Sequence, residues 1–432
     1  MKFLCLLLFL LAGFDPISLL LSPILNAESE FVPNYDESAV ADYTLPDPLV
    51  SSDGKVIDAP NEWTNIRRRQ ILRVYGEELY GIVPDASCGA IHFDETESSR
   101  KALGGLAIRK QGVLYLNWPE KDPKVNLLIY LPAKGEGPFP AFCGLNFEGN
   151  MTTSREPEVF GKAYHYRNET SESEVFGRGV KSHRWPVEMI VARGYALVTA
   201  CYEDIVPDFP DPERRFGAWP LIGEYLARNR VPDNIAPGTI SVWSWGLSRI
   251  LDVLETFPEI DSSRVAVMGH SRLGKTALWA GANDQRFALV ISNDSGCGGA
   301  SLYRHRFGET FEFMNDKIPW WFCENSRVYA GKTDELPFDQ HHLITLIAPR
   351  PVYVASAAED GWADPKGEFL SALHADAVYR LLGTNGINGA TEWPTIDTPI
   401  GGIIHYHVRH GGHDVTTYDW ECYLDFADQY MK

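Results

Sequence analysis

The chain has 432 residues and a formal net charge of −19, with 39 Lys and Arg residues against 58 Asp and Glu residues. Its hydrophobic content of 44% and charged content of 22% are ordinary for a globular protein. Because phosphate backbones are bound by clustered Lys and Arg, the acidic balance argues against nucleic acid as a partner. The one dense basic run, Arg67–Arg69, lies in a helical pattern, and we interpret it as a solvated helix face.

The first 27 residues have the pattern of an export signal. A basic residue precedes two apolar runs, at 3–11 and 17–25, and the second run leads to the small residue Ala27. Asp15 interrupts the stretch, which favours a cleaved signal over the alternative, an N-terminal membrane anchor. We therefore predict a mature chain that is secreted, to the periplasm or outside the cell, and that does not span a membrane.

Seven cysteines are present, and removal of the signal with Cys5 leaves Cys88, Cys143, Cys201, Cys297, Cys323 and Cys422. Export permits disulfides, but the sequence does not choose among the possible pairings. Two of these cysteines, at 143 and 201, end apolar strand-like runs, so buried free thiols are an equal alternative. CxxC spacing is absent from the sequence, and we predict neither a metal nor another cofactor.

Residues 28–60 are polar and rich in proline, and they predict an extended N-terminal segment. A helical pattern at 62–80 and a β-rich stretch follow, and from there apolar runs alternate with helical patterns. This alternation predicts an α/β fold with a mostly parallel central sheet flanked by helices. The predicted strands are 114–118, 125–131, 140–145, 196–201, 264–268, 288–292, 352–356 and 403–408, and the later helices are 187–193, 242–257 and 418–430.

Three long insertions separate these elements, at about 147–185, 203–240 and 300–340, and they are rich in Pro, Gly, Trp and Tyr. Long loops at the strand ends of an α/β sheet usually build the substrate site, so we expect them around the active site. Neither an internal repeat nor a low-complexity region interrupts the pattern. We therefore expect residues 28–432 to form a single catalytic domain with an N-terminal extension, and we expect a monomer.

The segment Gly269–Gly274, of sequence GHSRLG, lies directly between the predicted strand 264–268 and a predicted helix. A strand that ends in a sharp turn and opens a helix is the context of a nucleophile elbow, in which the turn lifts a Ser hydroxyl above the sheet. Ser271 is therefore the candidate nucleophile, and the backbone N–H of Arg272 can donate to an oxyanion. The spacing departs from the usual GxSxG, because Leu273 holds the place of the second glycine.

The elbow and the parallel sheet resemble the α/β-hydrolase fold, in which the catalytic triad follows the order Ser, acid, His. The base should then follow the last strand, and His410 and His413 both lie in the loop after the strand 403–408. We favour His413 because two glycines precede it, and His410 is the rival. His405 and His407 alternate along the strand, and we interpret them as packed there.

Two aspartates are candidates for the acid. Asp360 follows the strand 352–356, the usual acid position in this fold, and Asp294 follows the strand 288–292, one element earlier. Either carboxylate could hold the tautomer of the imidazole and stabilise its charged form.

Five blocks in order along the chain resemble the glucuronoyl esterase family of carbohydrate esterases. They are GHSRLGK at 269–275, NDSGCGG at 293–299, LPFD at 336–339, IAPR at 347–350 and GGH at 411–413, and the resemblance runs from about Leu127 to the C-terminus. It implies an α/β-hydrolase fold and a serine esterase that works through an acyl-enzyme without a metal. The implied substrates are esters of (4-O-methyl-)glucuronic acid, such as those between glucuronoxylan and lignin alcohols.

The resemblance also implies roles for single residues. Ser271 corresponds to the nucleophile, His413 to the base, and Arg272 to a residue that stabilises the oxyanion through its backbone and its guanidinium. The family usually has Glu at the position of Asp294, whereas some bacterial members use an acid at the position of Asp360. Because Asp is shorter than Glu by one methylene, we favour Asp360. The implied sugar contacts are Lys275, Glu309 and Trp362.

These contacts make physical sense, because polar side chains discriminate ring hydroxyls and an indole can cover a pyranose face. The positions that carry a disulfide in fungal members are His270 and Asp414 here, so the bacterial branch fits better. Two alternatives stay open: another carbohydrate esterase, such as an acetyl xylan esterase, and a non-catalytic carbohydrate-binding protein on the same fold. A peptidase is a weaker third.

Overall fold

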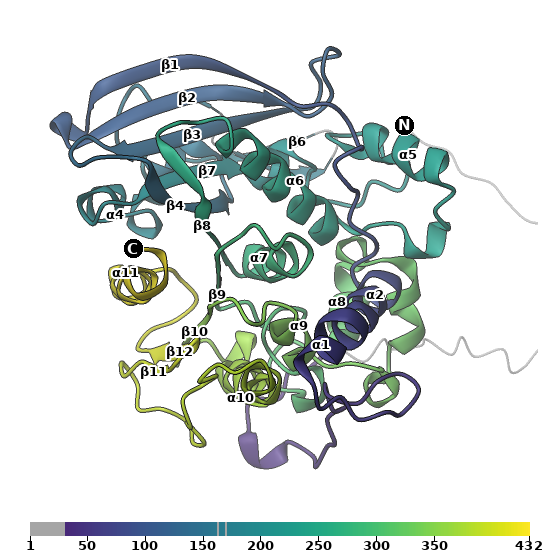
Figure 1. The fold of residues 1–432 in the computed structure, drawn as a ribbon. Helices are drawn as coiled ribbons and strands as arrows, with labels where there is room; N and C mark the ends of the chain where they lie inside the picture. Colours follow the sequence, from purple (N-terminus) through teal and green to yellow (C-terminus); the bar gives the residue numbers. More distant parts are fainter. Residues whose placement is uncertain (1–30, 162–163, 169–170) are drawn as a thin grey trace, which may run out of the picture. The chain divides into compact units, whose positions relative to one another are not determined.

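A ten-stranded sheet runs through the structure in the order β1-β2-β3-β7-β4-β8-β9-β10-β12-β11 (Figure 1). The six neighbouring strands β7, β4, β8, β9, β10 and β12 are parallel to one another. At one edge β1, β2 and β3 pair antiparallel, and at the other edge β11 pairs antiparallel with β12. The strands are β1 His92–Ala102, β2 Ala107–Tyr115, β3 Lys124–Pro132, β4 Phe139–Asn146, β7 Ala196–Cys201, β8 Ile260–His270, β9 Leu289–Asn293, β10 Val352–Ala357, β11 Ile400–Gly401 and β12 Ile404–Arg409.

This computed structural model describes residues 31–161, 164–168 and 171–432. Contacts divide the chain into residues 1–32 and a compact unit of residues 33–432, and everything below concerns the second unit. The predicted export signal, residues 1–27, lies outside the described residues. Within the described part of the chain, no helix is both long enough and apolar enough to cross a membrane.

Helices cover both faces of the sheet. Figure 1 shows α4 and α11 on one side and α6 and α7 on the other. The core is accordingly divided in two, because successive strand residues point to opposite faces: Phe142 and Leu197 pack with one cluster, and their neighbours Cys143 and Val198 pack with the other. The helices are α1 Pro60–Glu62, α2 Arg68–Glu78, α3 Asn150–Thr153, α4 Val187–Ala192, α5 Trp219–Asn229, α6 Thr239–Leu254, α7 Arg272–Asn283, α8 Phe311–Lys317, α9 His341–Thr345, α10 Pro365–Leu381 and α11 Thr417–Met431.

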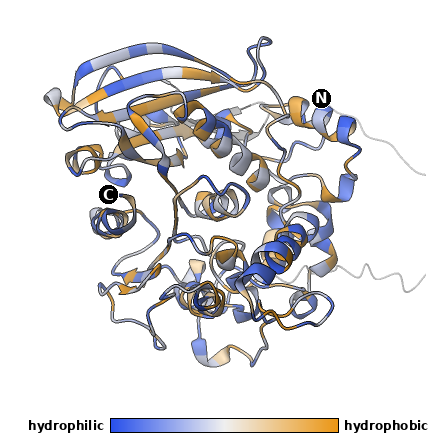
Figure 2. Cartoon of the chain, in the orientation of Figure 1, coloured by the Kyte–Doolittle hydropathy of each residue, from blue (hydrophilic) through white to orange (hydrophobic). Residues whose placement is uncertain are grey.

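These elements confirm the expected α/β class and the mostly parallel sheet. The predicted strands from 125 onward and the helices at 187, 242 and 418 are present with ends that differ by a few residues. The insertions are less irregular than expected, because they contain α5, α8 and a separate hairpin of β5 (Tyr164–Asn168) and β6 (Ser171–Val175). Edge strand β1 is largely hydrophilic (Figure 2), and its sequence carries no clear apolar alternation.

The interpretation of Arg67–Arg69 as a solvated helix face is wrong for two of the three residues. Arg67 and Arg68 are buried, and only Arg69 is exposed. The Nη2 atom of Arg68 donates to the backbone oxygens of Ala282 and Leu346, at 2.7 and 2.9 Å. These carbonyls lie at or just beyond the ends of α7 and α9, where helix carbonyls need donors. The guanidinium therefore fastens α2 to two other helices.

The six cysteines of the described residues all carry free thiols, and five of them are buried. Cys143 lies in β4 and Cys201 ends β7, as their apolar surroundings predicted. Burial raises the pKa of the Cys143 thiol to about 12, so this group stays a neutral, unreactive part of the core.

Candidate active site

The elbow joins β8 to α7 at Ser271. The residue has φ 58° and ψ −129°, a strained backbone conformation for a side chain other than Gly, and its N–H donates to the backbone oxygen of Asn293 at 2.9 Å. Gly269 is needed for the same turn, because a Cβ there would lie 1.9 Å from the backbone oxygen of Leu273. Helix α7 begins at Arg272, directly after the serine.

The displaced second glycine also has a packing reason. A Cβ on Gly274 would lie 2.9 Å from the Cβ of Ser295, in the segment that follows β9. Gly274 thus lets α7 approach that segment, while Leu273, in the place of the usual glycine, is buried in the core. The departure from GxSxG reflects which residue of the helix faces the neighbouring loop.

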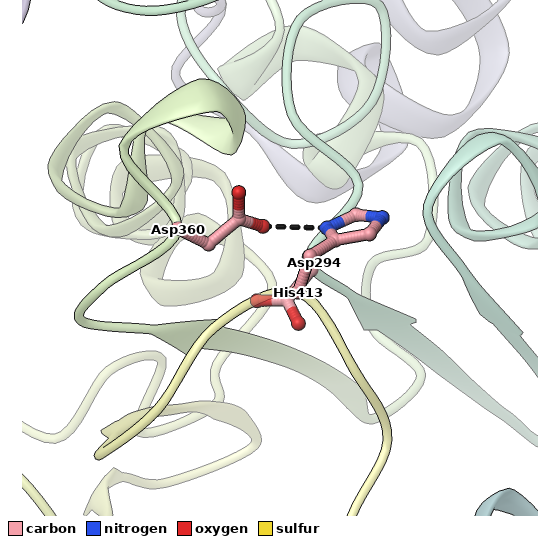
Figure 3. Close-up of side chains that lie close together, drawn as sticks. All are labelled: Asp294, Asp360 and His413. Atoms are coloured by element: carbon pink, nitrogen blue, oxygen red, sulfur yellow. Dashed lines mark hydrogen bonds and ion pairs between the residues drawn. The ribbon is translucent and has the colours of Figure 1, made fainter.

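His413 and Asp360 form the central hydrogen bond of the site (Figure 3). The Nδ1 atom of His413 lies 2.6 Å from Oδ2 of Asp360. The two residues follow the adjacent parallel strands β12 and β10, whose carboxyl ends lie at the same edge of the sheet. Asp360 is buried and His413 is partly exposed, so the acid is fixed and the outer part of the ring can receive a substrate.

The imidazole of His413 also contacts the elbow. Its ring centroid lies 4.4 Å from that of His270, the residue before the candidate nucleophile. His270 is held by a contact of 2.6 Å between its Nδ1 and Oδ1 of Asn293. Burial and the nearby His413 keep the pKa of His270 well below its usual value, so this neighbour is a neutral ring. The candidate base therefore does not share the site with a second imidazolium.

Asp294 lies beside the same imidazole. Polar atoms of Asp294, Asp360 and His413 all lie within 4.8 Å of one another, and Figure 3 shows the three side chains together. Asp294 accepts a hydrogen bond from Nη2 of Arg409 at 3.3 Å. It is fully buried, and burial, with Glu368 nearby, raises its pKa well above the ordinary value for Asp. Asp294 thus faces Arg409, whereas Asp360 is bonded to the ring.

The same three side chains are the one group with the spacing to hold a metal ion among the described residues. Their existing contacts account for the grouping without one. The carboxylate of Asp360 is bonded to the imidazole of His413, and the guanidinium of Arg409 already supplies a positive charge to Asp294.

The other histidines of the C-terminal segment lie elsewhere. His410, the rival base, is exposed, and its Nδ1 lies 2.5 Å from Oδ2 of Asp397. His407 is buried in β12 between the hydroxyl of Tyr353 and the carboxylate of Asp419. His405, also in β12, has its Nδ1 atom 3.4 Å from the backbone oxygen of Gly402. Among these C-terminal histidines, only His413 is bonded to one of the two candidate acids.

Lys275, Glu309 and Trp362 are brought together. Nζ of Lys275 is buried and donates to the backbone oxygen of Ser295 at 2.7 Å and to Oε2 of Glu309 at 3.4 Å. The backbone N–H of Glu309 donates to the backbone oxygen of Trp362 at 2.9 Å. The Trp362 ring meets Phe313 edge-on. The three proposed sugar contacts therefore form one group, built from α7 and from the loops that lead into α8 and α10.

Two further residues were not found from the sequence. Asp208, in the insertion 203–240, forms an ion pair with the Arg272 guanidinium. Glu368, in α10, accepts hydrogen bonds from the backbone of Ser295 and Gly296, which follow Asp294. Burial raises the pKa of Glu368 to about 8. Each residue contacts distant parts of the chain, and such contacts leave no local pattern in the sequence. Neither residue therefore lies in a recognisable motif.

The fold and the elbow define the class of the protein. The architecture is that of an α/β-hydrolase, with the Ser271 turn between a parallel strand and a helix. A family model described as "Glucuronyl esterase, fungi" matches residues 232–383.

Two curated proteins and one solved structure are similar to this chain. Carbohydrate esterase MZ0003, from an unknown prokaryotic organism, is 46% identical over 410 residues, which is 92% of each chain. The solved structure of a promiscuous CE15 esterase from a marine bacterial metagenome matches with a TM-score of 0.84 and 46% identity, over 93% of this chain and all of that one. A 4-O-methyl-glucuronoyl methylesterase from Phanerochaete chrysosporium is 32% identical over 196 residues, 41% of each chain.

The chain belongs to carbohydrate esterase family 15, the glucuronoyl esterases. It is therefore a carboxylic ester hydrolase.

Proposed function

We propose that the protein hydrolyses esters of 4-O-methyl-glucuronic acid with Ser271 as nucleophile, His413 as base and Asp360 as the orienting acid. The observation that carries the proposal is the 2.6 Å contact between His413 and Asp360 beside the strained elbow. An acid on Nδ1 keeps the proton there, which leaves Nε2 free to accept a proton from a hydroxyl.

The reaction then proceeds in two halves. The Ser271 hydroxyl attacks the ester carbonyl and gives its proton to Nε2 of His413. The backbone N–H and the guanidinium of Arg272 stabilise the negative oxygen that forms. The carbonyl re-forms, the C–O bond to the alcohol breaks, and the alcohol leaves with the proton from His413. Water then attacks the glucuronoyl–Ser271 ester in the same way and releases the acid.

The group of Lys275, Glu309 and Trp362 supports a uronic acid as the acyl group. A buried ammonium and a neighbouring carboxylate can donate to and accept from ring hydroxyls, and an ester that lacks those hydroxyls would leave both unpaired. The relatives named 4-O-methyl-glucuronoyl methylesterases act on such esters, as their names state. We infer that the natural substrates are glucuronoxylan esters, including those with lignin alcohols.

A substrate comparison tests this assignment. The kcat/KM value for methyl 4-O-methyl-glucuronate should exceed that for an acetylated xylo-oligosaccharide. Lys275→Met should lower the kcat/KM value for the glucuronate ester, because it removes the proposed contact to the glucuronate ring. It should leave the kcat/KM value for the acetyl ester nearly unchanged. An enzyme that prefers the acetyl ester, or loses both activities equally in Lys275→Met, would instead be the broader carbohydrate esterase of the alternative interpretation.

We also propose that residues 1–27 are removed on export and that the mature enzyme is a secreted monomer. A substrate in the plant cell wall has to be reached outside the cytoplasm, which supports this location. Sequencing the N-terminus of the secreted protein and measuring its mass in solution test the two statements. A mature chain that still carries residues 1–27, or a stable dimer, would contradict them.

A further inference from the structure

Asp208 makes a set of buried contacts in which no proposed triad residue takes part. Its Oδ2 atom accepts from Nη1 of Arg272, while Oδ1 accepts from the indole N–H groups of Trp320 and Trp321, at 2.9 and 2.7 Å. The side chain is almost completely buried. We propose that Asp208 is a positioning residue for ester hydrolysis, which holds the Arg272 guanidinium beside the oxyanion.

The surrounding groups fix the guanidinium on more than one side. Its central carbon lies 5.1 Å from the ring centroid of Trp321 and 5.8 Å from that of Phe147. The indole of Trp321 thus has two functions, since its N–H orients Asp208 and its ring lies next to the cation. Asp208, Trp321 and Phe147 come from three separate insertions of the chain, so these insertions converge on one arginine.

The charges explain why an acid is needed there. Burial disfavours the Arg272 cation, but the attraction of Asp208 outweighs it and raises the pKa of the guanidinium above its usual value. Nε of Arg272 is buried and has no hydrogen-bond partner among the described residues. Asp208 engages Nη1 alone, so donors of the same planar group are left for a substrate oxygen.

Without Asp208 the cation would lose its fixed orientation. Glu309 is another acid that attracts Arg272, and it is already bonded to Lys275. A guanidinium released from Asp208 would therefore compete for one of the proposed sugar contacts. Asp208 in this view keeps the residue of the oxyanion site apart from those of the sugar site.

The inference rests on the proposed role of Arg272, and a double-mutant cycle separates the two. Asp208→Asn keeps the shape of the side chain and an acceptor for the indoles, but removes the charge. It should lower kcat on methyl 4-O-methyl-glucuronate by about ten- to a hundredfold, part of the cost of losing an oxyanion donor, with little change in KM. In an Arg272→Ala background the same change should have no further effect on kcat.

Two variants serve as controls. Asp211 is an acid in the same insertion whose side chain accepts from the backbone N–H groups of Arg215 and Phe216, so Asp211→Asn should affect stability and leave kcat unchanged. Trp320→Phe keeps an aromatic side chain but removes the indole N–H that donates to Asp208. It should therefore lower kcat less than Asp208→Asn does. If Asp208→Asn does not fold, the cycle with Arg272→Ala is run with Trp320→Phe.

The outcomes are distinguishable. Equal losses of kcat from Asp208→Asn in both backgrounds would show that Asp208 acts independently of Arg272, and would overturn the inference. A change confined to the melting temperature would overturn it as well. Near-native kcat in Arg272→Ala alone would refute the proposed role of Arg272 while the Ser271 mechanism stands.

Discussion

The sharpest prediction concerns the acid of the triad, and the perturbation is Asp360→Asn. The variant keeps the volume of the side chain but loses the negative charge 2.6 Å from Nδ1 of His413. An amide there stabilises the imidazolium poorly, and its N–H₂ group favours the tautomer with the proton on Nε2, which cannot accept from a serine. Losses of this kind are typically about 10⁴ in kcat, which at about 1.4 kcal/mol per tenfold is roughly 5.5 kcal/mol of transition-state stabilisation.

Asp294→Asn is the matched variant, because it makes the same chemical change on the other side of the imidazole. Asp294 is bonded to Arg409 and not to the ring. Burial and the nearby Glu368 raise the pKa of Asp294, so its carboxyl is protonated more readily than an ordinary aspartate and is less suited to balance an imidazolium. We expect its kcat to stay within about tenfold of the wild type, with most of the cost appearing in stability, since a buried partner of Arg409 is lost.

The assay is kcat and KM on one glucuronate ester at one pH for both variants and the double variant. A severe Asp294→Asn beside a near-native Asp360→Asn would refute the reasoning from the observed hydrogen bond. Two mild single variants with a severe double variant would mean that the acids share the role, because one then substitutes for the other. In either case the esterase assignment would stand.

Other predictions test the base, the absence of a metal requirement and one buried ion cluster. His413→Ala should cost as much kcat as Ser271→Ala, and the double variant hardly more; independent, multiplying losses would speak against a catalytic pair. Excess EDTA should leave glucuronate esterase activity unchanged, and a loss that a divalent cation restores would refute this. Burial lowers the pKa of His305, but Asp364 and Glu37 outweigh it and raise the pKa above 6.5. The protonated imidazole therefore contributes its full stability below pH 6.5, and this contribution is lost as the pH rises through the folded-state pKa. His305→Gln should lower the melting temperature more near pH 6 than near pH 9, and equal losses at the two pH values would contradict this prediction.

The parallel sheet and the elbow could be predicted from the sequence because their residues are locally informative. Apolar runs such as Ala196–Cys201 mark strands that are buried on both faces, and the serine turn carries its own glycine. Helix α10 gave no such signal. Its buried face includes Gly367, Glu368 and Ser371, so the polar and small residues point inward and the usual apolar periodicity is hidden.

The choice between the two acids also needed three-dimensional information. Asp294 and Asp360 both follow parallel strands, and nothing local distinguishes a carboxylate that faces Arg409 from one that faces His413. Asp208 was missed for the same reason. Its partners lie 64 residues away at Arg272 and more than a hundred away at Trp320, and a contact of that kind has no periodicity in the sequence.

The central claim is that Ser271 attacks the ester, and the direct measurement is kcat of Ser271→Ala on methyl 4-O-methyl-glucuronate, together with the affinity of the variant for glucuronate by calorimetry. We predict a loss of kcat on the order of 10⁶ with binding largely unchanged, because the hydroxyl is needed for the bond that forms and not for holding the sugar. A Ser271→Ala variant that binds glucuronate normally and keeps near-native kcat would contradict the catalytic account.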